Sequence, residues 1–182
     1  MGDFHVKAIN TDKERGDFYH AMLRDLEAFE YMLNEGLIEQ KSDTIGAEQE
    51  ICIVDSRGNP MPAALEILSK IDMDCYTNEL ALYNLEINLS PQKLKGNCFA
   101  KITEELETSM RYGREKAAEL DASLFLTGNL PTLGFRHLMF DYMTPEDRYK
   151  LISTELLKLR GRDFEVFLQG VDDFQAKLDS VL

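Results

Sequence analysis

The stretch IGAEQEICIV, residues 45–54, has the pattern of a β-strand that carries acids on one side. Successive side chains of an extended chain point to opposite faces. Glu48 and Glu50 therefore share one face of this strand, and the reverse side is apolar. The stretch predicts a strand that separates a polar surface from a hydrophobic core.

A second stretch, ELALYNLEINL at residues 79–89, repeats this pattern. By the same alternation Asn84, Glu86 and Asn88 share one face. The opposite face is apolar and carries Ala81, Tyr83, Leu85, Ile87 and Leu89. Carboxylates on neighbouring strands, held in place by an apolar reverse side, are typical of a site for a hard divalent cation such as Mg²⁺. The two stretches together predict a magnesium site and indicate phosphate chemistry.

Composition and charge argue against a nucleic-acid-binding, membrane-spanning or secreted protein. The chain has 182 residues, enough for one domain, and a formal net charge of -13. A strongly acidic surface repels a phosphate backbone, so nucleic acid is not an expected partner. No stretch approaches the roughly 20 apolar residues of a membrane span, and the N-terminus lacks the pattern of a secretory signal. Three cysteines at long spacings match neither a zinc motif nor a disulfide framework, and a reducing cytoplasm is the expected setting.

Residues 11–36 have the pattern of an amphipathic helix that follows an extended arm. Thr11 and Glu14 have the spacing of a capping box, and Gly36 is a typical helix end. Apolar residues recur at every third or fourth position: Phe18, Met22, Leu26, Phe29 and Leu33. Such a stripe usually packs into the core of its own chain, and this is the expectation here. A neighbouring domain or a second subunit could also cover it.

The rest of the chain alternates strands and helices. Strands are expected over about 44–55, 80–89, 123–127 and 163–169, and helices over about 63–72, 97–120 and 144–160. Thr144 and Pro145 should cap and open the last of these helices, and Asp172 should cap one more. Strands that alternate polar with apolar residues are typical of antiparallel sheets. The expected fold is α+β, with a mostly antiparallel sheet and helices packed on one face.

Four segments, in order, resemble the N-terminal part of the bacterial carboxylate–amine ligases of the glutamate–cysteine ligase type. GAEQEICIVD at 46–55 is similar to the family's opening Gly-x-Glu-x-Glu strand and turn, and ELALYNLEINLSP at 79–91 is similar to its second strand. TGNLPT at 127–132 resembles the segment before a family loop, and DRY at 147–149 resembles the start of the next helix. The resemblance covers residues 44–182 and implies a glutamine-synthetase-like fold.

The sequence departs from the family pattern in two ways. Leu130-Pro131 stands where many relatives have His-Pro. The catalytic domain of the family is also about twice as long. Residues 41–182 are therefore expected to form a truncated N-terminal portion of such a domain, a half domain, behind an arm and helix in residues 1–40. This portion alone is expected to be inactive.

The resemblance implies a reaction that uses ATP and Mg²⁺. A carboxylate, such as the side chain of glutamate, attacks the terminal phosphate of ATP, and an amine then captures the acyl phosphate. Mg²⁺ would bridge the phosphates to Glu48, Glu50 and Glu86, the implied catalytic and metal-binding residues. Glu79, Asn88 and Arg148 are the implied substrate-binding residues. Glutamate and cysteine, the best-known pair of substrates, would place the chain in glutathione biosynthesis.

These residues also have a structural interpretation. Acids on an alternating strand usually form a solvated face, and Arg148 could pair with neighbouring acids at the surface. His137 and Cys52 are expected to be packed rather than catalytic. Two other functions stay open. One is a non-catalytic module that self-associates, as a homo-oligomer, or pairs with another chain. The other is a magnesium-dependent phosphohydrolase, for which no nucleophile or water-activating base is evident.

Overall fold

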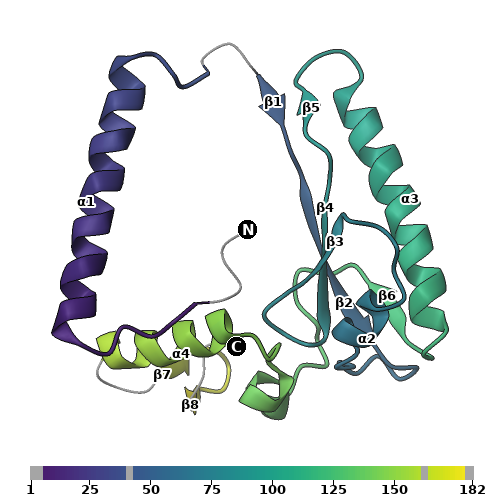
Figure 1. Cartoon of the computed structure of the whole chain (residues 1–182). Helices are drawn as coiled ribbons and strands as arrows, with labels where there is room; N and C mark the ends of the chain where they lie inside the picture. Colours follow the sequence, from purple (N-terminus) through teal and green to yellow (C-terminus); the bar gives the residue numbers. More distant parts are fainter. Residues whose placement is uncertain (1–5, 40–42, 161–163, 179–182) are drawn as a thin grey trace.

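The computed structural model describes residues 6–39, 43–160 and 164–178 and shows an α+β fold (Figure 1). The helical elements described are α1 (Asp12–Asn34), α2 (Ala64–Leu68), α3 (Cys98–Ala118), α4 (Asp147–Arg160) and the 3₁₀ turns η1 (Phe135–Leu138) and η2 (Phe140–Tyr142). The strands are β1 (Thr44–Ile45), β2 (Glu48–Val54), β3 (Tyr76–Asn78), β4 (Asn84–Asn88), β5 (Gln92–Lys93), β6 (Ser123–Phe125), β7 (Phe164–Leu168) and β8 (Phe174–Leu178). All strand pairs among these residues are antiparallel, as the alternation predicts.

The central sheet has the strand order β3-β4-β2-β6. β2 and β4 are its inner strands, and their register places Ile51 opposite Leu85. In β4 the burial alternates residue by residue, so Leu85 and Ile87 are fully buried while their neighbours are partly exposed. β1 and β5 form a separate two-stranded extension at the far end of β2. The alternating sequence pattern therefore produces one apolar and one open face.

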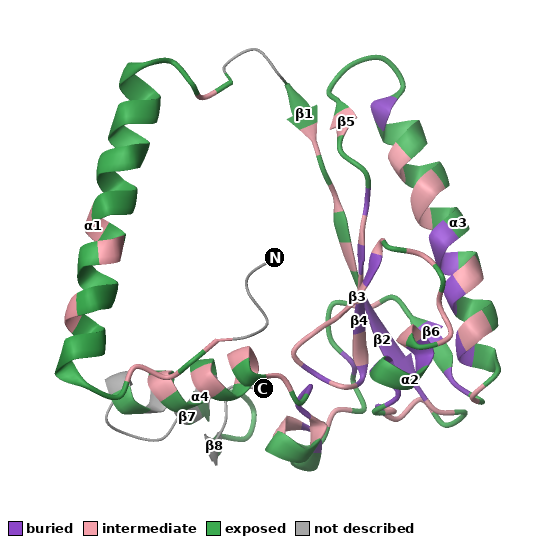
Figure 2. Ribbon diagram, viewed as in Figure 1, coloured by how far each residue is buried: buried purple, intermediate pink, exposed green. Residues whose placement is uncertain are grey.

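Helices α2 and α3 cover the apolar face of the sheet (Figures 1 and 2). The core between them contains Ile51, Ile53, Ile67 and Leu85, each with no exposed surface. Figure 2 shows that the buried residues are concentrated in the sheet and along the side of α3 that meets it. The packing of helices on one face of the sheet is as expected from the sequence.

α3 approaches the sheet closely because Gly113 has no side chain. A Cβ atom at this position would overlap the hydroxyl and ring of Tyr76 on β3 and would crowd a methyl group of Leu124. The Tyr76 hydroxyl donates a hydrogen bond of 2.7 Å to the carbonyl oxygen of Ser109, one turn earlier on α3. Burial raises the pKa of Tyr76 to about 12, so this hydroxyl keeps its proton. The contact fixes α3 against the edge of the sheet.

α1 has the caps that the sequence predicts. The Thr11 side chain accepts from the Glu14 amide, and the Glu14 carboxylate accepts from the Thr11 amide at 2.9 Å. Gly36 ends the helix with a φ of 65°, a value that glycine adopts without strain. The expected packing of the α1 stripe into the core is wrong, because α1 has no buried residue and Phe18 remains 60% exposed. Figure 1 shows α1 on the other side of the sheet from α3 and apart from it.

Residues 142–144, which precede α4, run along the connection between β3 and β4 and are hydrogen-bonded to it. The Leu82 amide donates to the Tyr142 carbonyl oxygen, and the Thr144 amide donates to that of Leu80, both at 2.8 Å. The Thr144 hydroxyl donates to the carbonyl oxygen of Glu79. Thr144 was expected to cap the helix, but it is buried and engaged in these bonds, and α4 begins at Asp147.

The end of the described chain is a β-hairpin. β7 pairs with β8 along its whole length, from Phe164 opposite Leu178 to Leu168 opposite Phe174. β7 confirms the strand expected near 163–169. The helix expected after Asp172 is wrong, because the alternation of apolar and polar residues in FQAKL gives β7 the partner that an isolated strand needs. No helix in the described ranges has the length and apolar character of a membrane span.

Candidate functional site

The open face of the sheet carries the acids singled out in the sequence. We call it the acid face and define it by Glu48, Glu50, Asn84, Glu86 and Asn88. The register of β2 with β4 places Glu50 directly opposite Glu86, and Glu48 directly opposite Asn88. Like charges at directly opposed positions of a sheet repel one another. The three glutamates thus lie on one face, and a cation between Glu50 and Glu86 would relieve the repulsion.

Glu79 joins Glu50 and Glu86 from the β3–β4 connection. One of its carboxylate oxygens accepts a hydrogen bond of 3.0 Å from the Leu80 amide. Burial raises the pKa of Glu79, and the Leu80 amide lowers it in part. A hydrogen bond with Glu86 and the negative charges of Glu86 and Glu50 raise it further. Glu79 and Glu86 therefore form a pair of carboxyl groups that can share a proton.

The two asparagines of the acid face present oxygen atoms that lack partners in the described structure. The Asn88 side-chain amide donates to a Glu86 oxygen at 2.6 Å. The side-chain oxygens of Asn88 and Asn84 are buried, and neither has a hydrogen-bond partner among the described residues. A buried acceptor without a partner is costly, so such atoms favour a bound donor or cation. The face is lined by oxygen atoms of the kind that Mg²⁺ prefers.

The acids do not converge on a single point. Within residues 6–39, 43–160 and 164–178, no group of three His, Cys, Asp or Glu side chains is arranged to hold a metal ion. Glu50, Glu79 and Asn84 line one pocket of ≈ 400 Å³, whereas Glu48 and Asn88 line another of ≈ 560 Å³. The donor atoms thus fit Mg²⁺ in kind, but the side chains form a row along the sheet instead of a closed cage.

Arg148 lies at the start of α4 in a half-buried network. Its Nε atom lies 2.8 Å from a carboxylate oxygen of Glu146, and its Nη2 atom donates to the Tyr149 hydroxyl at 2.7 Å. The other Glu146 oxygen accepts from the side-chain amide of Asn78, the last residue of β3. Both charged side chains are only 22% exposed, so the ion pair is not the solvated surface pair that the sequence allowed.

This network reaches the acid face through Tyr149. Burial raises the pKa of Tyr149, and the nearby negative charge of Glu79 raises it further. The structure therefore places Tyr149 near Glu79, while Arg148 contacts Tyr149 and is paired with Glu146. The pairing of Arg148 with a neighbouring acid was foreseen, and Glu146 is that acid. The roles of Asn78 and Tyr149 were not foreseen. The segment DRY at 147–149 was the available signal, since it drew attention to this helix start.

Cys52 and His137 are packed, as expected. Burial raises the pKa of the Cys52 thiol, and the charge of Glu50 raises it further, which opposes formation of a reactive thiolate. His137 is 3% exposed and its Nδ1 atom accepts from the Gly134 amide at 2.8 Å. Its ring meets that of Tyr142 edge to face, with 5.1 Å between centroids. Burial lowers the pKa of His137, which favours the neutral ring.

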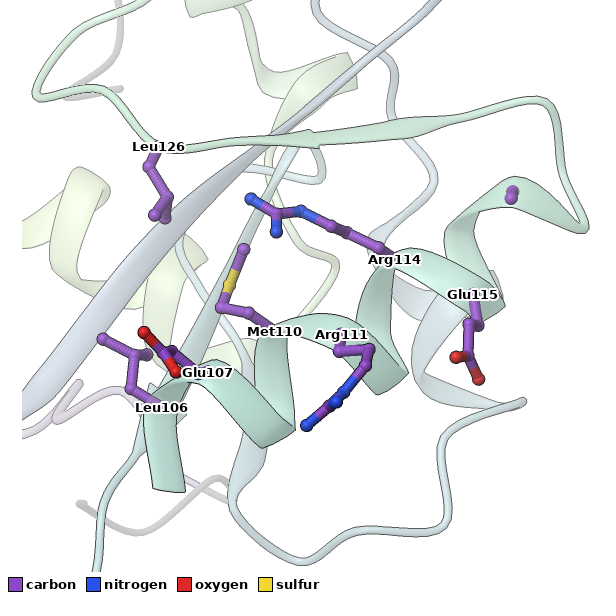
Figure 3. Close-up of a pocket in the computed structure, with 8 residues that line it drawn as sticks. Leu106, Glu107, Met110, Arg111, Arg114, Glu115 and Leu126 are labelled. Atoms are coloured by element: carbon purple, nitrogen blue, oxygen red, sulfur yellow. The ribbon is translucent and has the colours of Figure 1, made fainter. Parts of the chain in front are cut away.

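A larger pocket, ≈ 790 Å³, lies along α3 and is separate from the acid face (Figure 3). Met110, Leu106 and Leu126 supply its apolar lining. Figure 3 shows Arg114 extending over Met110 toward Leu126, while Arg111 points elsewhere. The pocket contains no row of oxygen donors, and its volume alone does not make it the site of chemistry. We therefore take the acid face as the candidate functional site.

Comparison with family models, with curated proteins and with solved structures finds no match to this chain.

Proposed function

We propose that this chain carries the N-terminal part of the active site of an ATP- and Mg²⁺-dependent carboxylate–amine ligase, similar to glutamate–cysteine ligase, with a glutamine-synthetase-like half domain. The observation that supports it best is the acid face itself. Glu50 and Glu86 lie opposite one another, and Glu79 lines the same pocket as Glu50, where burial and the nearby Glu86 raise its pKa. The resemblance of four segments, in order, to this family implies which reaction the acid face would support. The reaction would take place in the cytoplasm.

Each residue would act through its position on the face. Bound magnesium would neutralise the phosphates of ATP, and the opposed pair Glu50 and Glu86 would hold it through carboxylate oxygens. Glu48, which lines the neighbouring pocket, would add negative charge beside that pair. Glu79, whose pKa is raised, would accept the proton that the incoming amine gives up. The unpartnered oxygens of Asn84 and Asn88 lie in separate pockets, and the Asn84 oxygen, in the pocket of Glu50 and Glu79, would accept a hydrogen bond from an ammonium group. Arg148, held by Glu146, would orient Tyr149 beside Glu79 and bind the carboxylate substrate.

Calorimetric titration of the chain with ATP and Mg²⁺ tests the proposal. A Glu50→Gln, Glu86→Gln double variant should lose at least tenfold in affinity for the magnesium–nucleotide complex, because both changes remove charge from the acid face. Glu66→Gln is the matched control, since Glu66 is an exposed acid on α2, which covers the opposite face of the sheet. Equal affinity in the double variant and the control, with unchanged circular dichroism, would reject the proposal.

A second candidate function, a non-catalytic interaction module, is favoured by one separate observation. The apolar stripe of α1 is exposed along the whole helix. Turnover of ATP by the chain with an amino acid and an amine would exclude a purely non-catalytic role. Absence of nucleotide binding together with self-association would favour that role over the ligase.

A further inference from the structure

α1 has 23 residues, none of them buried, and one side of it exposes a row of large apolar side chains. We define the α1 stripe as Phe18, Met22, Leu26, Phe29 and Leu33, whose side chains are 60%, 41%, 56%, 52% and 53% exposed. At 100° per residue these five positions fall within one quarter of the helix circumference. Figure 2 shows α1 exposed along nearly its whole length. A continuous apolar patch of this kind marks an interaction surface.

The chain's own sheet does not suit the stripe. α2 and α3 already cover the apolar face of the sheet. The face that remains open carries Glu48 and Glu50, both exposed. Burying these carboxylates under Phe18 or Phe29 would remove them from water without a partner, which is strongly unfavourable. Neither face of the central sheet therefore covers the stripe, and its five side chains remain available to an apolar surface of a partner.

We propose that the α1 stripe pairs with the α1 stripe of a second copy, with the two helices antiparallel. A large side chain offers 150–250 Å² and these are about half exposed, so each stripe presents on the order of 500 Å². Two copies together remove about 1,000 Å² from water, the lower bound for a specific interface. A two-fold axis near the middle of α1 would place Met22 opposite Leu26, and the Phe18 end opposite the Phe29 end.

Charge favours the antiparallel arrangement. The last turn of α1 has no basic residue, although the C-terminal end of a helix carries partial negative charge. Between residues 24 and 35 four acids, Asp25, Glu27, Glu30 and the C-cap Glu35, outnumber the one basic residue, Arg24. Arg15 lies at the other end of the helix on the stripe side, where it pairs with Asp12 at 3.5 Å and keeps a side chain 66% exposed. Antiparallel pairing brings Arg15 and the positive helix N-terminus against the acidic end of the partner helix. Parallel pairing would place like ends together.

Sedimentation equilibrium of the full chain over a range of concentrations tests the pairing. The unaltered chain should form a dimer, and a Leu26→Ser, Phe29→Ser variant should be a monomer at the same concentrations. Tyr31→Ser is the matched control, because Tyr31 is as exposed as Phe18, at 60%, but lies on the opposite side of α1. A monomeric unaltered chain, or a stripe variant that remains dimeric, would overturn the proposal.

A charge exchange tests the orientation. Arg15→Glu and Glu30→Arg should each weaken the dimer, and the two changes together should restore it, because the antiparallel arrangement brings these positions close across the interface. A double variant no stronger than the weaker single variant would overturn the antiparallel arrangement. Circular dichroism of each variant checks that the helix content is unchanged, so that loss of the dimer is not loss of α1.

Discussion

α1 and α3 are amphipathic helices of similar length, 23 and 21 residues, but only α3 packs against the sheet. The buried side of α3 contains small residues, Ser109, Gly113 and Ala117, beside the larger Met110. Small residues let a helix backbone approach the side chains of a sheet closely. The stripe of α1 consists of large apolar side chains, which suit interdigitation with another helix. The spacing of apolar residues predicts both helices. The size of those residues indicates the surface that each helix packs against: a sheet for α3 and another helix for α1.

Matched methionine substitutions give the largest expected difference between the two helices. Met110 on α3 is 3% exposed and Met22 on α1 is 41% exposed. Met110→Ala should lower the free energy of unfolding by ~2–5 kcal/mol, because it leaves a cavity in the core. Met22→Ala should change it by less than ~0.5 kcal/mol when unfolding is measured at concentrations too low for the proposed dimer to form. Urea unfolding measures both, and similar losses would contradict the assigned burial.

Matched glycine substitutions should have opposite signs. Gly113→Ala would drive a methyl group into Tyr76 and Leu124, and should destabilise the chain by ~1–3 kcal/mol despite the better helix propensity of alanine. Gly16 on α1 has no atom within 4 Å of an added Cβ. Gly16→Ala should therefore strengthen the helix locally by up to ~1 kcal/mol. Urea unfolding and helical circular dichroism separate the two effects, and a stabilising Gly113→Ala would contradict the close approach of α3.

Substitution of the N-caps should affect α1 more than α3. Thr11 and Glu14 form a reciprocal capping box, whereas the Asn97 side chain makes no capping hydrogen bond at the start of α3. Thr11→Ala should weaken α1 locally by ~1 kcal/mol, and Asn97→Ala should have almost no effect on α3. The circular dichroism signal of the helices, followed during mild heating, measures the loss of helix stability in each variant. A larger loss from Asn97→Ala would show that α3 depends on its cap instead of on its packing.

Two glutamates should respond to pH in opposite directions. Hydrogen bonds from Thr11 and Asn10 lower the pKa of Glu14, so its stabilisation is complete above the ordinary value of 4.5 and is lost as pH falls through the lowered pKa. Burial raises the pKa of Glu79, so a destabilising contribution develops as pH rises from 4.5 through the raised pKa. Glu79→Gln should therefore raise the melting temperature more at neutral pH than at pH 4.5. An equal rise at both pH values would contradict the burial of a charged Glu79.

The sequence predicted the inner strands well, because β4 alternates residue by residue and β2 alternates in its first half. In the second half of β2, Cys52 and Val54 are buried against Leu130 on the side of the acids. The expected strands near Glu48 and Glu86 were confirmed, and so was the side of the sheet that each residue faces. The capping box at Thr11 and the stop at Gly36 were also confirmed, because both depend only on neighbouring residues. Local chemistry fixes such features before any tertiary contact forms.

Features that depend on distant residues were not predictable. Thr144 has the sequence environment of a helix cap, but its hydrogen bonds to Glu79 and Leu80 come from a segment about sixty residues earlier in the chain. Asp172 has the position of a helix cap and predicts a helix after it, but residues Phe174–Leu178 alternate in polarity and form β8 against β7. In the candidate site, the row of acids was predictable from alternation, but the neighbourhood of Glu79, Glu146 and Tyr149 was not. Such contacts arise only when the chain has folded.

The hydrogen bonds that tie the segment before α4 to the β3–β4 connection also offer a way to observe the acid face. The amides of Leu82 and Thr144 donate to carbonyl oxygens across this junction, and the Thr144 hydroxyl donates to the carbonyl oxygen of Glu79. Their exchange with deuterium requires the junction to open. A molecule that holds Glu79 in place should slow this exchange, whereas one that binds elsewhere on the protein should leave it unchanged. Two backbone amides can therefore report occupancy of the site without a labelled ligand or a catalytic assay.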